Sequence, residues 1–356
     1  MLVNTGSLVE GCILAKNIKS LTNKPIITKN TILTPEHIKV LESFLIDEVE
    51  VEPTLANGEP FLPKEMDETI APADKEEDFV QIYFNTVQNY KKLFGKWQSG
   101  AHIDYGVVRQ TIIPLIERLL AEPRNVRNIH HYSNKRDYLY HHAVATSLIS
   151  VSIAQQMQLE KREIAIVAVA AFLMDCGMCR IDSKILQSVS ILKKDEFVQI
   201  KEHPIYSYQM VSKIPYIQDE VKLAILQHHE RQDRSGYPFG LQDDKLHTVS
   251  RIISVADVYH AMTSERMYRP KQSPYKVLEQ LQQEAFGKFD LLVVKALIAV
   301  FCSISIGTIV KLSSGDVAEV AFIEQDSPTR PMVKVQKTGE FISLKQRLDL
   351  YIEDIK

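Results

Sequence analysis

The spacing of hydrophobic residues changes twice along the 356-residue chain. Before about residue 55, short β-type segments at 8–14, 26–27, 31–33 and 49–51 alternate with turn residues. Thr34-Pro35-Glu36 has the capping hydroxyl and first-turn proline that open a helix. From Glu76 to about residue 300, apolar residues recur at helical spacing and strand signals are few. After Ile306 the period indicates strands again, with residues 313–316 forming the turn of a hairpin.

This pattern predicts a mostly α protein with a small sheet-containing module at each end. The expected parts are an N-terminal α+β module at 1–55, a linker rich in proline and charge at 56–75, a helical connector at 76–129, a helical bundle at 130–305 and a C-terminal β module at 306–356. Within the last module, residues 309–312, 317–323, 331–335 and 348–352 are the expected strands.

Composition places the chain among ordinary globular proteins, with 45% hydrophobic and 24% charged residues. The net charge of -3, without a basic block, argues against nucleic acid or an anionic membrane as a partner. Four cysteines are too few for a disulfide scaffold, so we expect a reducing compartment and a cytoplasmic location. The longest apolar runs are either too short or interrupted by Lys295, so no membrane span or signal peptide is expected.

Candidate metal ligands recur at the ends of successive predicted helices. They are His142, Asp175, His203, the adjacent pair His228-His229, and Asp257. Imidazole is the commonest protein ligand for transition metals, and a carboxylate inside an apolar helix is costly unless it is paired or coordinates a cation. Each acid could instead cap a helix or meet a lysine, and the histidine pair could be structural. Their recurrence within one bundle favours a shared metal site.

The order of these residues resembles the HD-GYP domain, a subgroup of the HD-superfamily metal-dependent phosphohydrolases. The resemblance covers about residues 130–300. Its motifs are His228-His229-Glu230-Arg231-Gln232-Asp233, Ser235-Gly236-Tyr237-Pro238, Gly240-Leu241, residues 251–257 and residues 261–269. The resemblance implies a helical bundle around two or three divalent ions, usually iron or manganese, and cyclic di-GMP as the substrate.

The resemblance also implies roles for individual side chains. The implied metal ligands are His142, Asp175, His203, His228, His229, Asp257 and His260. Asp175 and His203 are the implied catalytic pair, Arg266 and Arg269 would hold the phosphates, and Tyr237 would line the nucleotide pocket. The two arginines could instead pair with surface acids, and Tyr237 could simply pack its loop. Glu230 and Asp233 are expected to orient the histidine pair and the loop rather than bind metal.

Three positions depart from the family pattern. Met174 replaces the histidine of the namesake dyad, Met178 replaces a lysine that would face the phosphate, and His260 replaces an aspartate. One metal position keeps all its ligands, and the neighbouring position has lost a nitrogen donor. We therefore expect one tightly bound transition metal and a cyclic-di-GMP-binding regulatory protein with weak or absent hydrolysis. An active phosphodiesterase and a structural module that binds no nucleotide are the alternatives, and a homodimer or a regulatory protein partner stays open.

Three further features have weaker expectations. Cys176 and Cys179 form a Cys-x-x-Cys pair that should be packed rather than redox-active. His141 is expected to be solvated or to cap a helix. Asp137 is a candidate acidic ligand before the first helix of the bundle, with an uncertain register against His142.

Overall fold

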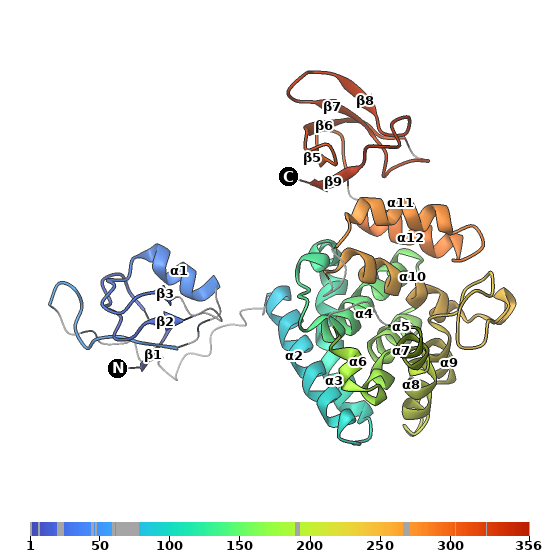
Figure 1. The fold of residues 1–356 in the computed structure, drawn as a ribbon, viewed down its shortest axis with the longest axis horizontal. Coiled ribbons are helices and arrows are strands. Elements are labelled where there is room, and N and C mark those ends of the chain that lie inside the picture. The colour runs from blue at the N-terminus through green and yellow to red at the C-terminus, as the bar shows by residue number, and fades with distance from the viewer. Residues whose placement is uncertain are drawn as a thin grey trace. The chain divides into compact units, whose positions relative to one another are not determined.

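The computed structural model describes residues 2–5, 8–19, 25–43, 46, 48–58, 61, 78–188, 193–265, 271–302, 304–324 and 326–355. Its contacts divide the chain into two compact units, Met1–Glu76 and Glu77–Lys356 (Figure 1). Most of the predicted linker lies outside the described residues. Each unit is therefore described by itself.

The first unit is a small α+β module, as predicted. Its elements are β1 (Leu2–Asn4), β2 (Ile18–Lys19), β3 (Pro25–Ile27), α1 (Pro35–Ser43) and β4 (Glu48–Glu50). β1 pairs antiparallel with β4, and β2 pairs antiparallel with β3. The strand expected around residues 8–14 was wrong, because among the described residues this segment makes only isolated bridges, from Ile13 to Ile32 and from Leu14 to Val51. Leu14, Leu33 and Val51 are nevertheless fully buried and form its core.

The second unit begins with a long series of helices. They are α2 (Phe79–Gln98), α3 (Tyr105–Ala121), η2 (Pro123–His131), α4 (Tyr138–Gln156), α5 (Lys161–Leu173), η3 (Cys176–Arg180), α6 (Ser183–Leu186), α7 (Lys194–Ile200), α8 (His203–Val211), α9 (Asp219–Gln227), η4 (Asp243–Lys245), α10 (Thr248–Thr263), α11 (Pro274–Glu284) and α12 (Leu291–Phe301). Among the helices that the structure describes, none is both long enough and apolar enough to cross a bilayer.

Helix α4 is the central element of this helical region. It packs against α2, α5, α10 and α12, and every side chain from His141 to Ala154 is buried. A helix that is buried on all sides shows little amphipathic pattern, and small residues such as alanine and serine let its neighbours approach closely. Ser147, for example, donates its hydroxyl to the carbonyl of Ala168 in α5. From His141 onward α4 therefore lies deep inside the bundle, where it packs against α10.

The chain ends in a five-stranded antiparallel sheet with the order β8-β7-β6-β5-β9. Its strands are β5 (Ile309–Leu312), β6 (Val317–Phe322), β7 (Met332–Val335), β8 (Phe341–Ser343) and β9 (Ile352–Ile355). The predicted hairpin and the strand at 331–335 are confirmed. The strand expected at 348–352 was wrong, because Leu348 is 72% exposed beside a turn and the strand begins only at Ile352. β8 was not predicted.

The sheet is attached to α11 by polar and apolar contacts. The guanidinium of Arg330 lies 2.6 Å from the carboxylate of Glu279 and also donates to the carbonyls of Leu344 and Leu350. Tyr275 of α11 is part of the sheet's hydrophobic core. The predicted fold class, a helical bundle with a small module at each end, is thereby confirmed. The domain boundaries at 129/130 and 305/306 stay predictions.

Candidate metal centre

Asp175 follows α5 and is placed by the close packing of η3 against α8. The backbone N–H of Gly177 donates to Ser207 Oγ at 2.8 Å. A Cβ on Gly177 would lie 2.5 Å from the carbonyl oxygen of His203, so only glycine allows this approach. The result is that Asp175, at the start of η3, lies beside His203 at the start of α8. Both side chains are nearly fully buried.

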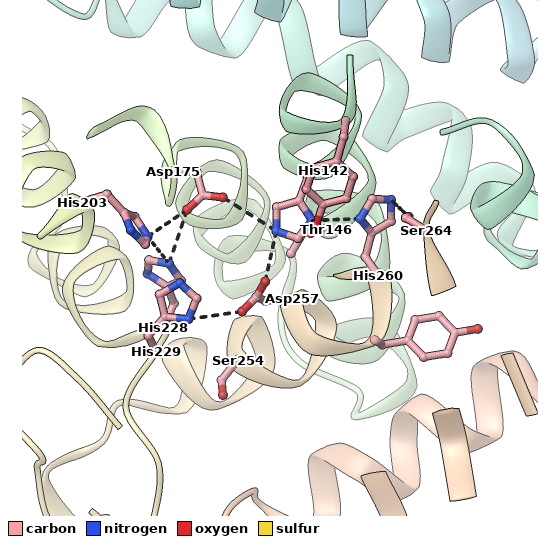
Figure 2. Close-up of polar contacts among 12 residues, drawn as sticks. His142, Thr146, Asp175, His203, His228, His229, Ser254, Asp257, His260 and Ser264 are labelled. Atoms are coloured by element: carbon pink, nitrogen blue, oxygen red, sulfur yellow. Dashed lines mark hydrogen bonds and ion pairs between the residues drawn. The ribbon is translucent and has the colours of Figure 1, made fainter. Parts of the chain in front are cut away.

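Two histidines converge on one oxygen of this carboxylate (Figure 2). His203 Nε2 lies 3.0 Å and His228 Nε2 3.6 Å from Asp175 Oδ1, and the two Nε2 atoms are 3.2 Å apart. The other ring nitrogen of each histidine, Nδ1, lies 2.6 Å from a backbone carbonyl oxygen, that of Ile200 or Ile225. Because a carbonyl can only accept, each Nδ1 carries a hydrogen. Each Nε2 is then the nitrogen that donates to Asp175 when the ring is protonated or offers a lone pair to a metal when it is neutral.

These four side chains fit a divalent transition metal ion. Asp175, His203, His228 and His229 each offer a ligand atom, and all four atoms lie within 4.8 Å of one another. Ligands that sit about 2.0–2.2 Å from one ion are roughly 3 Å or slightly more from each other, which matches the observed separations. The two Nε2 atoms, 3.2 Å apart, can share a hydrogen bond or bind one cation between them. Imidazole nitrogens with one carboxylate oxygen are the donors that such ions prefer.

A second group lies on the other side of Asp175. His142, from the first turn of α4, has its Nε2 atom 3.0 Å from Asp257 Oδ1 and 3.7 Å from Asp175 Oδ2. Asp257, from α10, also contacts His229, whose Nδ1 atom lies 3.3 Å from Asp257 Oδ2. Two carboxylates and an imidazole thus meet here, and His229 lies between the two groups. Six of the seven predicted ligands are therefore brought together.

His260, the seventh predicted ligand, lies behind His142 rather than beside the carboxylates (Figure 2). Its Nδ1 atom is 2.8 Å from His142 Nδ1, and its Nε2 atom is 3.1 Å from Ser264 Oγ. The nitrogen of His142 that it contacts is the one that does not face Asp257. His260 therefore contacts the cluster through His142. Met174, which the resemblance places at a dyad histidine, is fully buried in the hydrophobic core.

The loop after the histidine pair is folded tightly against it. A Cβ on Gly236 would lie 2.5 Å from the backbone of His229, Glu230 and Arg231. The carboxylate of Glu230 accepts the N–H groups of Phe239 and Leu241, at 2.7 and 3.0 Å. The ring of Tyr237 then stacks on His229, with 4.6 Å between ring centroids. Glu230 thus shapes the loop that places Tyr237 over the site, in the role expected for it.

Burial and charge keep the cluster in the form that binds metal. Burial alone raises the pKa of the Asp175 carboxyl, but bonds from His203 and His228 outweigh it, and the pKa lies well below its ordinary value. Burial also raises the pKa of Asp257, but the neighbouring histidines outweigh this effect, so its pKa too is lowered. Burial, reinforced by His228, holds the pKa of His229 well below 6.5. Ionised carboxylates and neutral imidazoles are the ligand forms that metals require.

A cavity of about 300 Å³ opens above these groups. This volume is at the lower end of the range for small-molecule sites. The residues that line it are Lys135, Arg136, Tyr138, Leu139, His142, Asp175, Met178, Ile185, Leu186, Ser188, Phe197, Ile200, His203, His229, Tyr237 and Asp257. Arg266 and Arg269, the predicted phosphate ligands, lie outside the described residues. Lys135 and Arg136 were not predicted, because only the fold brings the bend before α4 to this cavity.

Two weaker expectations were wrong. Asp137 is not directed at the cluster, because its carboxylate lies 2.8 Å from Lys91 Nζ of α2. His141 is buried rather than solvated, and its Nδ1 and Nε2 atoms lie 3.0 Å from Tyr83 Oη and 3.2 Å from Asn134 Nδ2. The two adjacent histidines therefore differ in role. His141 contacts Tyr83 of α2, and His142 faces Asp175 and Asp257.

The cysteine pair is packed, as expected. Cys176 and Cys179 are both buried, and neither forms a disulfide. Burial raises the pKa of both thiols, so they stay protonated at neutral pH. The Sγ atom of Cys179 lies 3.7 Å from Met210 Sδ of α8. A protonated thiol in an apolar environment is inert, which fits the structural role.

Comparison with known proteins agrees with this geometry. A family model for the HD domain matches residues 127–293, which include all seven predicted metal ligands and the Gly236-Tyr237-Pro238 loop. The match to the HD domain, together with similarities to curated and solved proteins, supports the predicted resemblance to the HD-GYP family over residues 127–293. The solved structure of an HDG"Y"P protein from Bdellovibrio bacteriovorus covers 84% of the chain, and 98% of that protein, with a TM-score of 0.52 and 15% identity. That likeness supports the fold.

Curated proteins that are similar to this chain are named as enzymes. A cyclic di-GMP phosphodiesterase of Pseudomonas aeruginosa is 27% identical over 68% of this chain and 58% of its own length. One from Borreliella burgdorferi is 28% identical over 58% of this chain and 55% of its own. One from Thermotoga maritima is 32% identical over 48% of this chain and 47% of its own. The chain thus spans between about half and three fifths of these relatives' lengths.

Proposed function

We propose that the HD-GYP domain binds cyclic di-GMP at a divalent transition-metal centre and hydrolyses it slowly. The convergence of His203 Nε2, His228 Nε2 and Asp175 Oδ1 carries this proposal, because two imidazole nitrogens and a carboxylate oxygen at these distances are a donor set for a divalent transition metal ion. The names of the relatives supply the substrate. Iron or manganese is the expected metal, with one ion bound tightly by Asp175, His203, His228 and His229.

The residues of the cavity would divide the work as follows. A bound divalent ion supplies Lewis acidity toward a phosphate oxygen and lowers the pKa of water. His203 and His228 hold their Nε2 atoms toward Asp175 through the bonds that their Nδ1 atoms donate to backbone carbonyls. Tyr237, stacked on His229, covers one wall and excludes water from the cluster. Asp175 and Asp257 carry the negative charge that retains the cation.

Slow hydrolysis is inferred from Met178, which lines the same cavity as Asp175 and His203. A thioether cannot donate a hydrogen bond and carries no charge, so it cannot stabilise the negative charge that develops on a phosphate in the transition state. Removing one such donor from an active site typically costs about 10²–10³ in turnover. Binding of the ground state depends less on this one side chain than turnover does.

The substitution Met178→Lys tests this proposal directly. We expect it to raise turnover of cyclic di-GMP by roughly ten- to a thousandfold, because it returns a cation to the cavity. Turnover is measured on metal-loaded protein by separating the nucleotide products. Met332→Lys makes the same chemical change on the surface of β7 and should leave turnover unchanged. Wild-type turnover within a fewfold of the Met178→Lys variant would contradict slow hydrolysis.

An efficient phosphodiesterase is the second candidate, and one observation favours it. His142 Nε2 lies between Asp257 Oδ1 and Asp175 Oδ2, so an imidazole is present on the side that lacks the dyad histidine. Two ions per chain with fast turnover in the wild type would support this candidate. A purely structural module is the third: titration calorimetry that detects no heat of cyclic di-GMP binding to metal-loaded protein would favour it over both others.

A further inference from the structure

Two basic residues lie at the cavity in a place that neither the motifs nor the relatives assign. Lys135 and Arg136 occupy the bend between η2 and α4, and both line the 300 Å³ cavity together with Asp175, Asp257 and Met178. They are the basic residues among the described residues of its lining. The cavity therefore has two cationic side chains, from a different part of the chain than Met178, where the resemblance expects a lysine.

The bend that carries them is fixed at both ends. Asn134 Oδ1 accepts the backbone N–H of Asp137 at 2.9 Å, which closes a short side-chain turn around Lys135 and Arg136. Asn134 Nδ2 also contacts His141, and Asp137 pairs with Lys91 of α2. The backbone of the bend is thus tied to two helices, so its two basic side chains are presented to the cavity by a supported loop.

Both side chains are accessible to a ligand. Lys135 Nζ lies 2.9 Å from Glu265 Oε1, but both side chains of this pair are 48% exposed. An ion pair that exposed contributes little net stability, so a phosphate can replace Glu265 as the partner of Lys135 at small cost. Arg136 is exposed. Its guanidinium offers a planar fork of donors that matches two phosphate oxygens.

The charges of the cavity indicate the class of ligand. The described lining contains two carboxylates, Asp175 and Asp257, and one divalent ion would cancel their charge. Lys135 and Arg136 then face the cavity with two positive charges once a ligand has displaced Glu265 from Lys135. A ligand with two phosphodiester groups, each carrying one negative charge, complements them, whereas a ligand with a single phosphodiester uses only half of this charge.

We propose that Arg136 and Lys135 are phosphate-binding residues for a ligand with two phosphodiester groups, and that they replace the cation lost at Met178 in binding. This inference rests on the proposed function, since cyclic di-GMP is such a ligand. Arg136 is the stronger contact, because it can form two parallel hydrogen bonds and has no ion pair to give up among the described residues. Lys135 acts as a point charge and must leave Glu265.

Titration calorimetry of metal-loaded, full-length protein with cyclic di-GMP tests the proposal. We expect Arg136→Ala to weaken binding about tenfold, Lys135→Ala a fewfold, and the double variant roughly thirtyfold or more. Arg136→Lys should recover part of the loss. Raising the salt concentration should weaken the wild type more than the double variant, because fewer charge contacts are left to screen. Arg124→Ala is the matched control: this arginine of η2 is also exposed but does not line the cavity.

The outcomes separate this inference from the function on which it rests. If the wild type binds cyclic di-GMP and Arg136→Ala and the double variant bind within twofold of it, the two basic residues are not ligand contacts and the proposed function stands. If the wild type itself does not bind, the proposed function fails and this inference fails with it. Unchanged metal content and thermal midpoints in all variants show that any loss of binding is local.

Discussion

The two oxygens of Asp175 face groups that are built in different ways. On the Oδ1 side, His203 and His228 are held by their own backbones, since each Nδ1 donates to the carbonyl three residues earlier in the chain. On the Oδ2 side, His142 is held by another side chain, His260, which is held in turn by Ser264. The first arrangement depends on helix ends, and the second on a sequence of side-chain contacts between α4 and α10.

This difference indicates how the two sides respond to loss of metal. Both Nε2 atoms on the Oδ1 side can offer lone pairs to a metal because their other nitrogens face carbonyl oxygens, so this side is preorganised for a cation. On the Oδ2 side, His142 Nε2 can instead donate a hydrogen to Asp257 Oδ1 at 3.0 Å, which satisfies both groups without a metal. We therefore expect an ion to bind tightly on the first side and weakly on the second.

Removing a ligand on the preorganised side should have the largest effect. We expect His228→Ala to lower affinity for the tightly bound ion by more than a hundredfold, beyond the roughly 10–100-fold typical of outer-shell changes. Metal content after dialysis, followed by competition with a chelator, measures the loss. His131→Ala removes an exposed histidine and serves as the control. Retention of one ion per chain by His228→Ala would show that the Oδ1 side is not the tight site.

A smaller and more selective effect is expected at His260. His260→Ala removes the nearest of the side chains that contact His142 Nδ1, at 2.8 Å against 3.2 Å for Tyr138 Oη, so affinity for an ion on the Oδ2 side should fall about 10–100-fold while the tight ion remains. A two-step metal titration separates the two sides. His260→Gln keeps a polar side chain near His142 and should restore part of the affinity. Equal weakening of both sites would mean that His260 acts on the fold as a whole.

The smallest effect, on the free energy of unfolding, should come from His141, which precedes His142 but contacts Tyr83 of α2. Burial lowers the pKa of His141 to about 4, below its ordinary value of 6.5. Because the unfolded chain binds this proton first, its contribution to stability is complete above pH 6.5 and is lost as the pH falls toward 4. Between pH 6.5 and 5 the loss should be about 1–2 kcal/mol, measured by urea unfolding of metal-free protein.

His141→Gln is the comparison for this pH effect. Glutamine does not titrate, so the variant should lose less stability than the wild type over the same pH interval. Other buried histidines, such as His229, contribute equally to both proteins and cancel in the difference. Parallel pH profiles for the two proteins would show that His141 is protonated in the folded state as easily as in the unfolded chain.

Much of the fold could be predicted from hydrophobic spacing, and the exceptions have physical reasons. The helical region was found because its apolar residues recur with a helical period over more than 200 residues. The strand expected at 348–352 was misplaced because a short apolar segment beside a turn has too few residues to set its own register. β8, with three residues, was missed for the same reason.

The site was predictable where residue type alone decides its chemistry. Six of the seven expected ligands lie together because buried acids and histidines at helix ends have few other uses. The place of His260 was not predictable, since one turn of a helix can present a side chain either to the metal or to its neighbouring ligand. Lys135 and Arg136 were missed because a charged bend looks the same in the sequence whether it faces solvent or a cavity.

The ion pair between Arg330 and Glu279 has a practical consequence for anyone who wishes to crystallise the helical region alone. Cutting the chain at the end of α12 would strand a carboxylate that is 9% exposed without its cation and would uncover Tyr275. Loss of one member of a buried pair typically costs about 3–5 kcal/mol. A fragment for crystallisation should therefore keep α11 and the sheet together, from residue 78 through β9.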